Sequence, residues 1–314
     1  MLHFLRAQVA DAVLAHSEPA IHADLIRLLS RPGYALHSDG RCRAGLFALE
    51  VYRAVRQDYD RTALVAAAAV EIQMQSGYVF DEVSDEEAED SRAEDLALAI
   101  ALLAAGTATA AEATSDSPDA AAAMRHFCVA TGGACAGQFL DARLARRGAA
   151  TLEEALHMTR LKSGSLGAFA AGFATRVAGL AAGAVPLFES LGFNLFTGAQ
   201  LVDDQRDACA AGARSDLARS RATLPVLFYA RHAAIDSGVR SDGTLSPTAR
   251  DVYDSSGASL YTAVLALAHL GRAREDLQSL AERGYATASL ATFLQGVESE
   301  AARTLGPVGG GVVA

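Results

Sequence analysis

The sequence predicts an all-α protein that folds as a single helical bundle. Apolar residues recur with helical period along almost the whole chain, and no segment shows the sustained apolar–polar alternation of a strand. Alanine is abundant, Trp is absent, and only 7 of the 314 residues are Pro, a composition that favours packed helices over sheets. With 51% hydrophobic and 20% charged residues, the chain can bury a large core.

The helices are expected between short segments rich in Gly, Pro, Ser and Asp, such as SRPGYALHSDG, TSDSPDA and TGGA. We expect residues 1–305 to form one domain and the Gly-rich end, GPVGGGVVA at 306–314, to be a flexible tail. In chain order, the expected helices are 2–29, 42–57, 60–83, 92–113, 118–132, 136–147, 151–181, 187–209, 214–235, 247–271, 275–283 and 286–304.

Charge and apolar patterning argue against several classes of protein. The net charge of −10 repels phosphate backbones, so we expect no nucleic-acid partner. The longest apolar run, GSLGAFAAGFATRVAGLAAGAVPLF, is interrupted by Arg176, and we interpret it as core helix rather than a membrane span. The 4 cysteines form no CxxC pair, and the first residues lack the apolar stretch of a signal peptide. We therefore expect a cytoplasmic protein that does not span a membrane.

Two clusters of carboxylates share one spacing, in which two adjacent acids are followed by a third acid four positions after the first. Each cluster follows an apolar, helix-compatible segment. Residues i and i+4 lie on one face of a helix, so each cluster would present two carboxylates side by side. A single acidic run is usually a solvated helix end, but two copies of one spacing favour a functional site. The clusters are Asp81, Glu82 and Asp85, and Asp203, Asp204 and Asp207.

Like charges at this spacing destabilise a helix unless something compensates them. Magnesium is the natural candidate, because it binds a few carboxylates together with substrate phosphate oxygens. We therefore expect Mg²⁺ to bridge two facing helices to a diphosphate, with all six acids of the two clusters as candidate metal ligands.

Five segments, in collinear order, resemble the trans-polyprenyl synthase family. DEVSD at 81–85 and GAQLVDDQRD at 198–207 resemble its two aspartate-rich motifs. GQFLD at 137–141 resembles its Gly-Gln-x-x-Asp element, and RLKSGSLGA contains Lys162 at the position of a diphosphate-binding lysine. SDLARSRATLPV resembles a further element, with Arg221 where Lys is usual.

The resemblance implies the isoprenoid synthase type of helical bundle, with a central cavity in which magnesium holds an allylic prenyl diphosphate. It also implies a homodimer. The catalytic residues would be Asp81, Asp85, Asp203 and Asp207, and the residues that bind the substrate diphosphate would be Arg41, Arg43, Arg92, Lys162, Gln200 and Arg221.

The sequence departs from this family at the site for isopentenyl diphosphate, the second substrate of chain elongation. Gly40 stands where a Lys is expected, and Met74 stands where a His is expected. Asp90 and Ser91 stand where an Arg pair is expected, although Arg92 is next to them. Loss of these groups weakens a second diphosphate site by several charged hydrogen bonds.

We therefore expect a class I terpene synthase that ionises one prenyl diphosphate and cyclises or eliminates it. One alternative is a chain-elongating synthase, and another is a prenyltransferase that uses a different acceptor, such as an indole. A catalytically inactive partner subunit is a fourth possibility, but it has no physical need for mutually repelling carboxylates.

Small residues before the first acidic motif indicate an open pocket. In the family, bulky aromatic residues at the positions of Ser76 and Gly77 close the pocket floor, so we expect a farnesyl or longer substrate, with geranylgeranyl favoured. The expected pocket residues are Met74, Ser76, Gly77, Tyr78 and Phe196.

Overall fold

The computed structural model confirms the all-α fold class. It describes residues 1–84, 92–117, 119–147, 150–208, 210, 215–219, 221–232, 253 and 255–305, and none of these residues forms a strand. The expected tail at 306–314 lies outside the described residues.

The helices follow one another through the whole described chain. In order, they are α1 (Leu2–Ala15), the 3₁₀ turn η1 (Pro19–Ile21), α2 (His22–Leu29), α3 (Arg43–Arg56), α4 (Arg61–Ser84), α5 (Arg92–Thr114), α6 (Ala120–Arg147), α7 (Leu152–Thr159), the π-helical turn η2 (Arg160–Gly164), α8 (Ser165–Val177), α9 (Val185–Ala208), α10 (Leu224–His232), α12 (Ala258–Glu282) and α13 (Ala288–Leu305).

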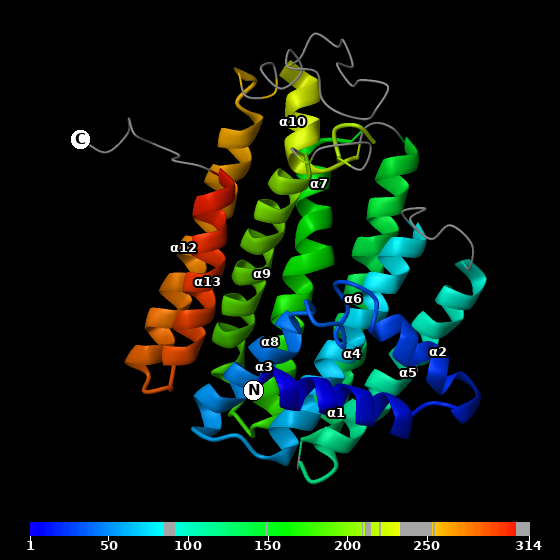
Figure 1. Cartoon of the computed structure of the whole chain (residues 1–314). Helices are drawn as coiled ribbons and strands as arrows, with labels where there is room; N and C mark the ends of the chain where they lie inside the picture. Colours follow the sequence, from blue (N-terminus) through cyan, green and yellow to red (C-terminus); the bar gives the residue numbers. More distant parts are fainter. Residues whose placement is uncertain are drawn as a thin grey trace.

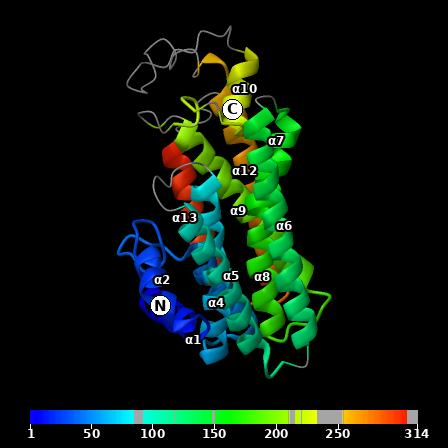
Figure 2. The ribbon, with the colours of Figure 1, turned by 90° about the vertical axis from the view of Figure 1, so that its right-hand side faces the viewer.

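The long helices run side by side, while α1 lies across the end of the bundle where α4 begins (Figures 1 and 2). Helix α4 packs against α3 and α5, and α9 packs against α8 and α12. The carboxyl-terminal ends of α4 and α9 reach the same end of the bundle (Figure 1). This arrangement brings the ends of the two helices that carry the acidic clusters to one region of the molecule.

Some expected helices are divided. The helix expected at 2–29 is interrupted at Pro19, because the proline ring fixes φ and removes a backbone N–H. The helix expected at 151–181 contains the π-helical turn η2 and ends at Val177. In place of the first part of the helix expected at 214–235, residues 215–219 form a turn.

Other expected helices are joined. Gly132 and Gly133 were expected to break the chain, but α6 continues through them, and a Cβ at either position would have no atom within 4 Å. A helix-interior Gly costs about 1 kcal/mol, which the packing of the two ends of α6 outweighs. Helix α12 similarly continues through residues 272–274.

Aromatic and aliphatic side chains fill the interior between the helices. Helices Arg61–Ser84 and Ala93–Thr114 are long and apolar enough to cross a membrane by length and composition; 78% of the apolar window of the first and 39% of that of the second is buried in the bundle. The apolar character of α4 is therefore explained by its place in the core. The largest fully buried aromatic side chains include Phe47, Phe127, Phe169, Phe173 and Phe188.

A buried polar network joins α9 to α12. Nδ1 of His269 lies 2.9 Å from Oδ1 of Asn194, and Nδ2 of Asn194 donates to the backbone carbonyl of Ser190 at 3.0 Å. Oγ of Ser190 donates to Oδ2 of Asp276 at 2.7 Å. Because Oδ1 of Asn194 is an acceptor, Nδ1 of His269 donates the proton in this pair.

The free energy of unfolding is expected to depend on pH through His269. Burial, aided by Arg160 and Arg272, lowers the pKa of this imidazole from 6.5 to about 4. Below pH 6.5 the imidazole is therefore protonated more readily in the unfolded chain than in the folded protein. The contribution of neutral His269 to the free energy of unfolding is fully present above about pH 6.5 and is lost as the pH falls towards 4. Urea unfolding between pH 4 and 8 should show a loss of about 3 kcal/mol that His269→Gln removes. An unchanged pH profile in that variant would contradict the assignment.

Candidate active site

A cavity of about 530 Å³ lies between α4, α6, α9 and α13 and the turn η2. Charged side chains reach it from four elements: Arg43 from α3, Asp81 from α4, Lys162 from η2 and Asp203 from α9. The rest of the wall is mostly apolar. Its large apolar residues are Met74, Phe80, Leu103, Phe139, Leu166, Leu195, Phe196, Phe293 and Val297.

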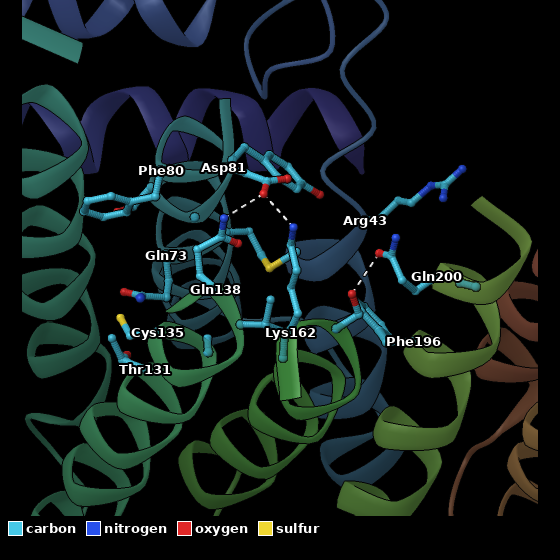
Figure 3. A pocket seen from close by; sticks show the side chains of 18 of the residues that line it. Arg43, Gln73, Phe80, Asp81, Thr131, Cys135, Gln138, Lys162, Phe196 and Gln200 are labelled. Carbon is cyan, nitrogen blue, oxygen red and sulfur yellow. Dashed lines mark hydrogen bonds and ion pairs between the residues drawn. The ribbon is translucent and has the colours of Figure 1, made fainter. Parts of the chain in front are cut away.

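Lys162 pairs with the first acidic cluster (Figure 3). Its Nζ donates to Oδ1 of Asp81 at 2.5 Å and to Oδ2 of Asp141 at 2.8 Å, and Nε2 of Gln138 donates to the same oxygen of Asp81 at 2.9 Å. Burial alone would lower the pKa of Lys162, but the carboxylates of Asp81 and Asp141 outweigh it and raise that pKa above its ordinary value. Lys162 is therefore a fixed positive charge beside the cavity.

The backbone around Lys162 explains how this side chain reaches the first cluster. Residues 160–164 form a π-helical turn, a local distortion often found at functional sites. Gly137 of α6 packs directly on this turn, since a Cβ at Gly137 would lie only 2.6 Å from the backbone nitrogen of Lys162. Glycine thus allows α6 and η2 to approach closely, which places Gln138 and Lys162 on the carboxylate of Asp81, and Asp141 on the same ammonium group of Lys162.

The second cluster is linked to the same turn by a chain of hydrogen bonds. Oγ of Ser163 donates to Oε1 of Gln200 at 2.8 Å, and Nε2 of Gln200 donates to Oδ1 of Asp204 at 2.8 Å. Asp204 is only 5% exposed. Burial raises its pKa to about 8, although the hydrogen bond from Gln200 opposes the shift. Burial therefore favours the protonated form of this carboxyl group.

Arg206 neutralises the other two acids of the second cluster. It lies 2.8 Å from Oδ1 of Asp203 and 3.5 Å from Oδ1 of Asp207, and its third partner is Glu300 of α13 at 3.1 Å. Burial raises the pKa of Asp203, and the charges of Arg206 and Arg43 oppose that shift. The repulsion predicted between these acids is thus compensated in this structure by a guanidinium.

Glu300 also pairs with the arginines at the start of α3. Its Oε2 lies 3.0 Å from Nη2 of Arg43 and 3.9 Å from Nη1 of Arg41. Gly40, just before these residues, has no space for a side chain, because a Cβ there would overlap the carbonyl oxygen of Tyr34. The chain is therefore folded so tightly at Gly40 that a lysine would not fit there without a backbone shift.

The donor chemistry of the acids fits magnesium. Asp81 and Asp203 reach the cavity from two helices, and carboxylate oxygens are the ligands that Mg²⁺ prefers. Within the described part of the chain, no group of three or more His, Cys, Asp or Glu is placed to hold a metal ion. Lys162 and Arg206 provide the positive charge that a metal would otherwise supply to these acids.

The structure brings only part of the predicted set to the cavity. Asp81, Asp203, Arg43, Lys162 and Gln200 line it. Asp85 lies outside the described residues, as does the side chain of Arg92. Among the described residues that do not line the cavity are Glu82, Asp204, Asp207, Arg41 and Arg221.

All five predicted pocket residues lie in the cavity wall. Ser76 donates its hydroxyl hydrogen to the carbonyl oxygen of Ala99 at 2.9 Å, and a Cβ at Gly77 would have no atom within 4 Å. The ring of Phe196 lies 5.4 Å from that of Phe47, centroid to centroid. Small residues therefore leave this part of α4 open.

Sequence reasoning did not assign Gln138, Asp141, Arg206 and Glu300 to the site. The element GQFLD was a usable signal for the first two, because it is part of the collinear pattern. Glu300 had no signal, since it is 257 positions from its partner Arg43 and no motif surrounds it.

A second, more polar cavity of about 430 Å³ adjoins the first. The two share Arg43, Tyr78 and Asp203 in their walls. Arg41, Arg206 and the buried Glu71 also line the second cavity. Oε2 of Glu71 accepts a hydrogen bond from the backbone N–H of Gly45 at 2.9 Å, near the start of α3.

Comparisons with known proteins agree on one family. The family model of polyprenyl synthetases matches residues 27–240, whereas no curated protein sequence matches the chain. A decaprenyl diphosphate synthase from Rhodobacter capsulatus superposes with a TM-score of 0.76 at 18% identity, over 96% of this chain and 95% of that one. A geranylgeranyl pyrophosphate synthetase from the archaeon Geoglobus acetivorans superposes with a TM-score of 0.77 at 18% identity, over 96% of this chain and 95% of that one.

A third solved structure contains ligands. It is a polyprenyl synthase from Caulobacter crescentus CB15 complexed with calcium and isoprenyl diphosphate, with a TM-score of 0.74 at 20% identity, over 97% of this chain and 94% of that one. At these identities the likeness shows the fold, and it confirms the expected isoprenoid synthase type of helical bundle.

Proposed function

The chain belongs to the polyprenyl synthetase family, and from that premise we propose that it is a magnesium-dependent terpene synthase. It ionises one allylic prenyl diphosphate, and the cation is then cyclised or eliminated without condensation with isopentenyl diphosphate. The substrate is farnesyl diphosphate or longer, with geranylgeranyl diphosphate favoured by the open wall at Ser76 and Gly77.

The observation that carries this proposal is the ion pairing of Glu300. Arg41 and Arg43 are the cationic residues that remain of the expected isopentenyl diphosphate site, and both lie within 4 Å of this carboxylate. A second diphosphate would have to displace Glu300 from both arginines and from Arg206. Charged hydrogen bonds contribute about 1.5–3 kcal/mol each, so Glu300 is a strong competitor for the anion.

Two neighbouring residues support the same conclusion. Gly40 has no room for the lysine that elongating members carry at this position. Met74, in place of a histidine, contributes an apolar side chain to the cavity wall, which suits a hydrocarbon rather than a phosphate.

The residues of the cavity suit the ionisation step. Lys162 is a cationic side chain of the wall, where it would bind the leaving diphosphate, with Gln200 as a hydrogen-bond partner. Asp81 and Asp203, together with the predicted ligand Asp85, would hold magnesium. The metal would supply charge neutralisation of the diphosphate. The apolar remainder of the wall would exclude bulk water from the carbocation.

A chain-elongating synthase is the second candidate. The second cavity adjoins the first at Arg43 and Tyr78, so an isopentenyl diphosphate or another acceptor, such as an indole, could approach the allylic carbon from there. The solved structures that resemble this chain carry names of elongating enzymes, although the likeness shows only the fold.

Product analysis separates these candidates. The protein would be incubated with Mg²⁺ and geranyl, farnesyl or geranylgeranyl diphosphate, each with and without isopentenyl diphosphate, and the products analysed by mass spectrometry. A terpene formed from one diphosphate alone supports the proposal. A longer prenyl diphosphate that requires isopentenyl diphosphate would overturn it in favour of elongation.

We also propose that the chain forms a homodimer through α5 and α6. Ile100 is 54% exposed, and Val129 and Phe139 are more than 60% exposed, an unusual exposure for large apolar side chains on two adjacent helices. Val129→Glu is expected to convert the dimer to a monomer in size-exclusion chromatography with light scattering. Leu260→Glu, at a similarly exposed leucine of α12, is the control. A dimer that survives Val129→Glu and Ile100→Glu would contradict this interface.

A further inference from the structure

We infer that Phe196 and Phe293 hold the distal part of the prenyl chain at the apolar end of the cavity and stabilise the carbocation that forms there, so that the enzyme releases a cyclic terpene hydrocarbon. This inference rests on the proposed ionisation of a single prenyl diphosphate. It adds the class of product and two residues that determine it. Phe293 belongs to α13, which lies outside residues 27–240 matched by the family model.

Helices α4, α9 and α13 repeat one order of side chains at the cavity. On each helix a carboxylate follows a smaller residue by three or four positions and a larger apolar residue by seven. Positions with these spacings share one face of a helix. The sets are Met74, Gly77 and Asp81 on α4, Phe196, Ala199 and Asp203 on α9, and Phe293, Val297 and Glu300 on α13. All of them except Glu300 line the cavity, which therefore has a charged level, a middle level and an apolar level.

Contacts with α3 separate the charged level from the apolar level. At the charged level, Nη2 of Arg43 lies 3.0 Å from Oε2 of Glu300. At the apolar level, the ring of Phe47 lies 5.6 Å from that of Phe293 and 5.4 Å from that of Phe196, centroid to centroid. Seven residues separate Phe293 from Glu300 on α13, which corresponds to about 10 Å along the helix axis. The two rings are thus remote from the diphosphate end.

Phe47 holds both rings in place. Its side chain is fully buried and does not line the cavity, whereas Phe196 and Phe293 do. Each of these two rings is tilted by 54° to the ring of Phe47, at a separation at which aromatic rings attract one another. The rings that border the cavity are therefore supported by a third, buried ring.

A carbocation at the apolar level needs a source of stabilisation other than a carboxylate. The carboxylates of the described cavity wall, Asp81 and Asp203, lie at the charged level. An aromatic ring attracts a cation that lies within about 6 Å of its centre, through the negative potential of its face. Phe196 and Phe293 can therefore stabilise the positive charge when it moves away from the diphosphate.

The middle level gives the prenyl chain room to fold. Gly77 and Ala199 line the cavity there, and a Cβ at Gly77 would have no atom within 4 Å. A folded chain can place a distal double bond between the ionised carbon and the rings of Phe196 and Phe293. Holding two reacting groups together favours their reaction. This arrangement favours ring closure over loss of a proton from the linear cation.

The proposed reaction is balanced without any further reagent. The carbon–oxygen bond to diphosphate breaks, and its electron pair leaves with the diphosphate. The π electrons of the distal double bond form a carbon–carbon bond to the ionised carbon, and the positive charge then lies on the other carbon of that double bond, beside Phe196 and Phe293. A neighbouring carbon loses a proton to the released diphosphate, and a new double bond forms. One prenyl diphosphate gives one cyclic hydrocarbon and one hydrogen diphosphate ion.

Ring fluorination at Phe293 tests the inference. Fluorine withdraws electron density from the face of a phenyl ring and changes the size of the side chain little, so each added fluorine weakens the attraction for a cation. The fluorinated proteins would turn over farnesyl and geranylgeranyl diphosphate with Mg²⁺, and the products would be analysed by gas chromatography and mass spectrometry. We expect the ratio of cyclic to linear products to fall with each added fluorine, by about tenfold in all.

The same fluorinated residues at Phe188 are the matched control. Phe188 lies on α9 like Phe196, but it is fully buried, packs against Tyr285 and does not line the cavity. Its fluorination should leave the product ratio unchanged. The inference would be overturned by a ratio that is insensitive to fluorination of Phe293, by equal changes at both positions, or by a wild-type product that is linear.

Binding of a stable cation gives a reading that needs no turnover. Isothermal titration calorimetry would measure the affinity of tetrabutylammonium for the wild type, Phe293→Leu and Phe188→Leu, each with Mg²⁺ and inorganic pyrophosphate. We expect Phe293→Leu to bind the cation about tenfold more weakly than the wild type, and Phe188→Leu to bind it equally well. Equal affinities in all three proteins, or no binding to any of them, would contradict the role of Phe293.

These readouts keep the inference separate from the proposed function. Diphosphate release from a single substrate reports on ionisation, whereas the product ratio and the ammonium affinity report on Phe293. Release of diphosphate without any dependence of the products on Phe293 would leave the proposed function in place and overturn the inference. Ammonium binding that depends on Phe293, without diphosphate release from any substrate, would overturn the proposed function and with it the cyclic product.

Discussion

Asp81→Asn is expected to lower the rate of diphosphate release by about 1,000-fold. The substitution keeps the shape of the side chain but removes the charge that pairs with Nζ of Lys162 at 2.5 Å. Among the described residues, Asp81 and Asp203 are the carboxylates that line the cavity as candidate magnesium ligands, and the substitution removes the first of them. Release of pyrophosphate, measured over a range of Mg²⁺ concentrations, should show both a lower maximal rate and a higher Mg²⁺ requirement.

Asp141→Asn is the matched control for this prediction. Asp141 contacts the same ammonium group at 2.8 Å but does not line the cavity. Its loss should change the rate by tenfold or less, without a change in Mg²⁺ requirement. Equal effects of the two substitutions would show that Asp81 acts only as an ion-pair partner of Lys162, and would contradict its role as a metal ligand.

Glu300→Gln is expected to let isopentenyl diphosphate bind about 100-fold more tightly. The wild-type carboxylate is held by Arg43 and Arg206 at 3.0 and 3.1 Å, with Arg41 at 3.9 Å. Removing its charge frees these guanidinium groups for a diphosphate, and a factor of 100 corresponds to about 2.7 kcal/mol, within the range of a charged hydrogen bond. Isothermal titration calorimetry with isopentenyl diphosphate measures this gain directly.

Glu298→Gln separates a local effect from a general change in charge. Glu298 lies on the same helix and pairs with Arg274 at 2.5 Å on the surface. The substitution removes the same charge two residues away, and the affinity should stay at the wild-type value. If neither variant binds isopentenyl diphosphate better than the wild type, Glu300 does not exclude the second substrate.

Formation of a longer prenyl diphosphate by Glu300→Gln would extend this result from binding to catalysis. This catalytic gain is expected to be smaller than the gain in binding, because Gly40 still lacks space for a lysine and Met74 still lacks a hydrogen-bonding group. Binding and product length should therefore be measured separately in the same variant.

The sequence alone was sufficient for the fold class and the family. Helical period, abundant alanine and scarce proline are local properties, and they determine helices before any tertiary contact forms. The spacing of acids at Asp81 and Asp203 is likewise a property of the printed sequence. So was the loss of expected groups at Gly40 and Met74, which first indicated that the second substrate site is altered.

Helix boundaries were less predictable, because they depend on packing. Gly132 and Gly133 would end an isolated helix, yet α6 continues through them since its two ends are held by neighbouring helices. Conversely, nothing in RLKSG indicates a π-helical turn. That turn accompanies the close approach of α6 at Gly137, which is a long-range contact.

What the sequence determined about this protein is therefore its helices, its family and the identity of its acids. Only the tertiary structure decided what those acids contact: Lys162 reaches Asp81 across 81 positions of sequence, and Glu300 reaches Arg43 across 257. Ion pairs and cavities depend on which distant side chains become neighbours when the helices pack, and local sequence patterns do not predict these long-range contacts.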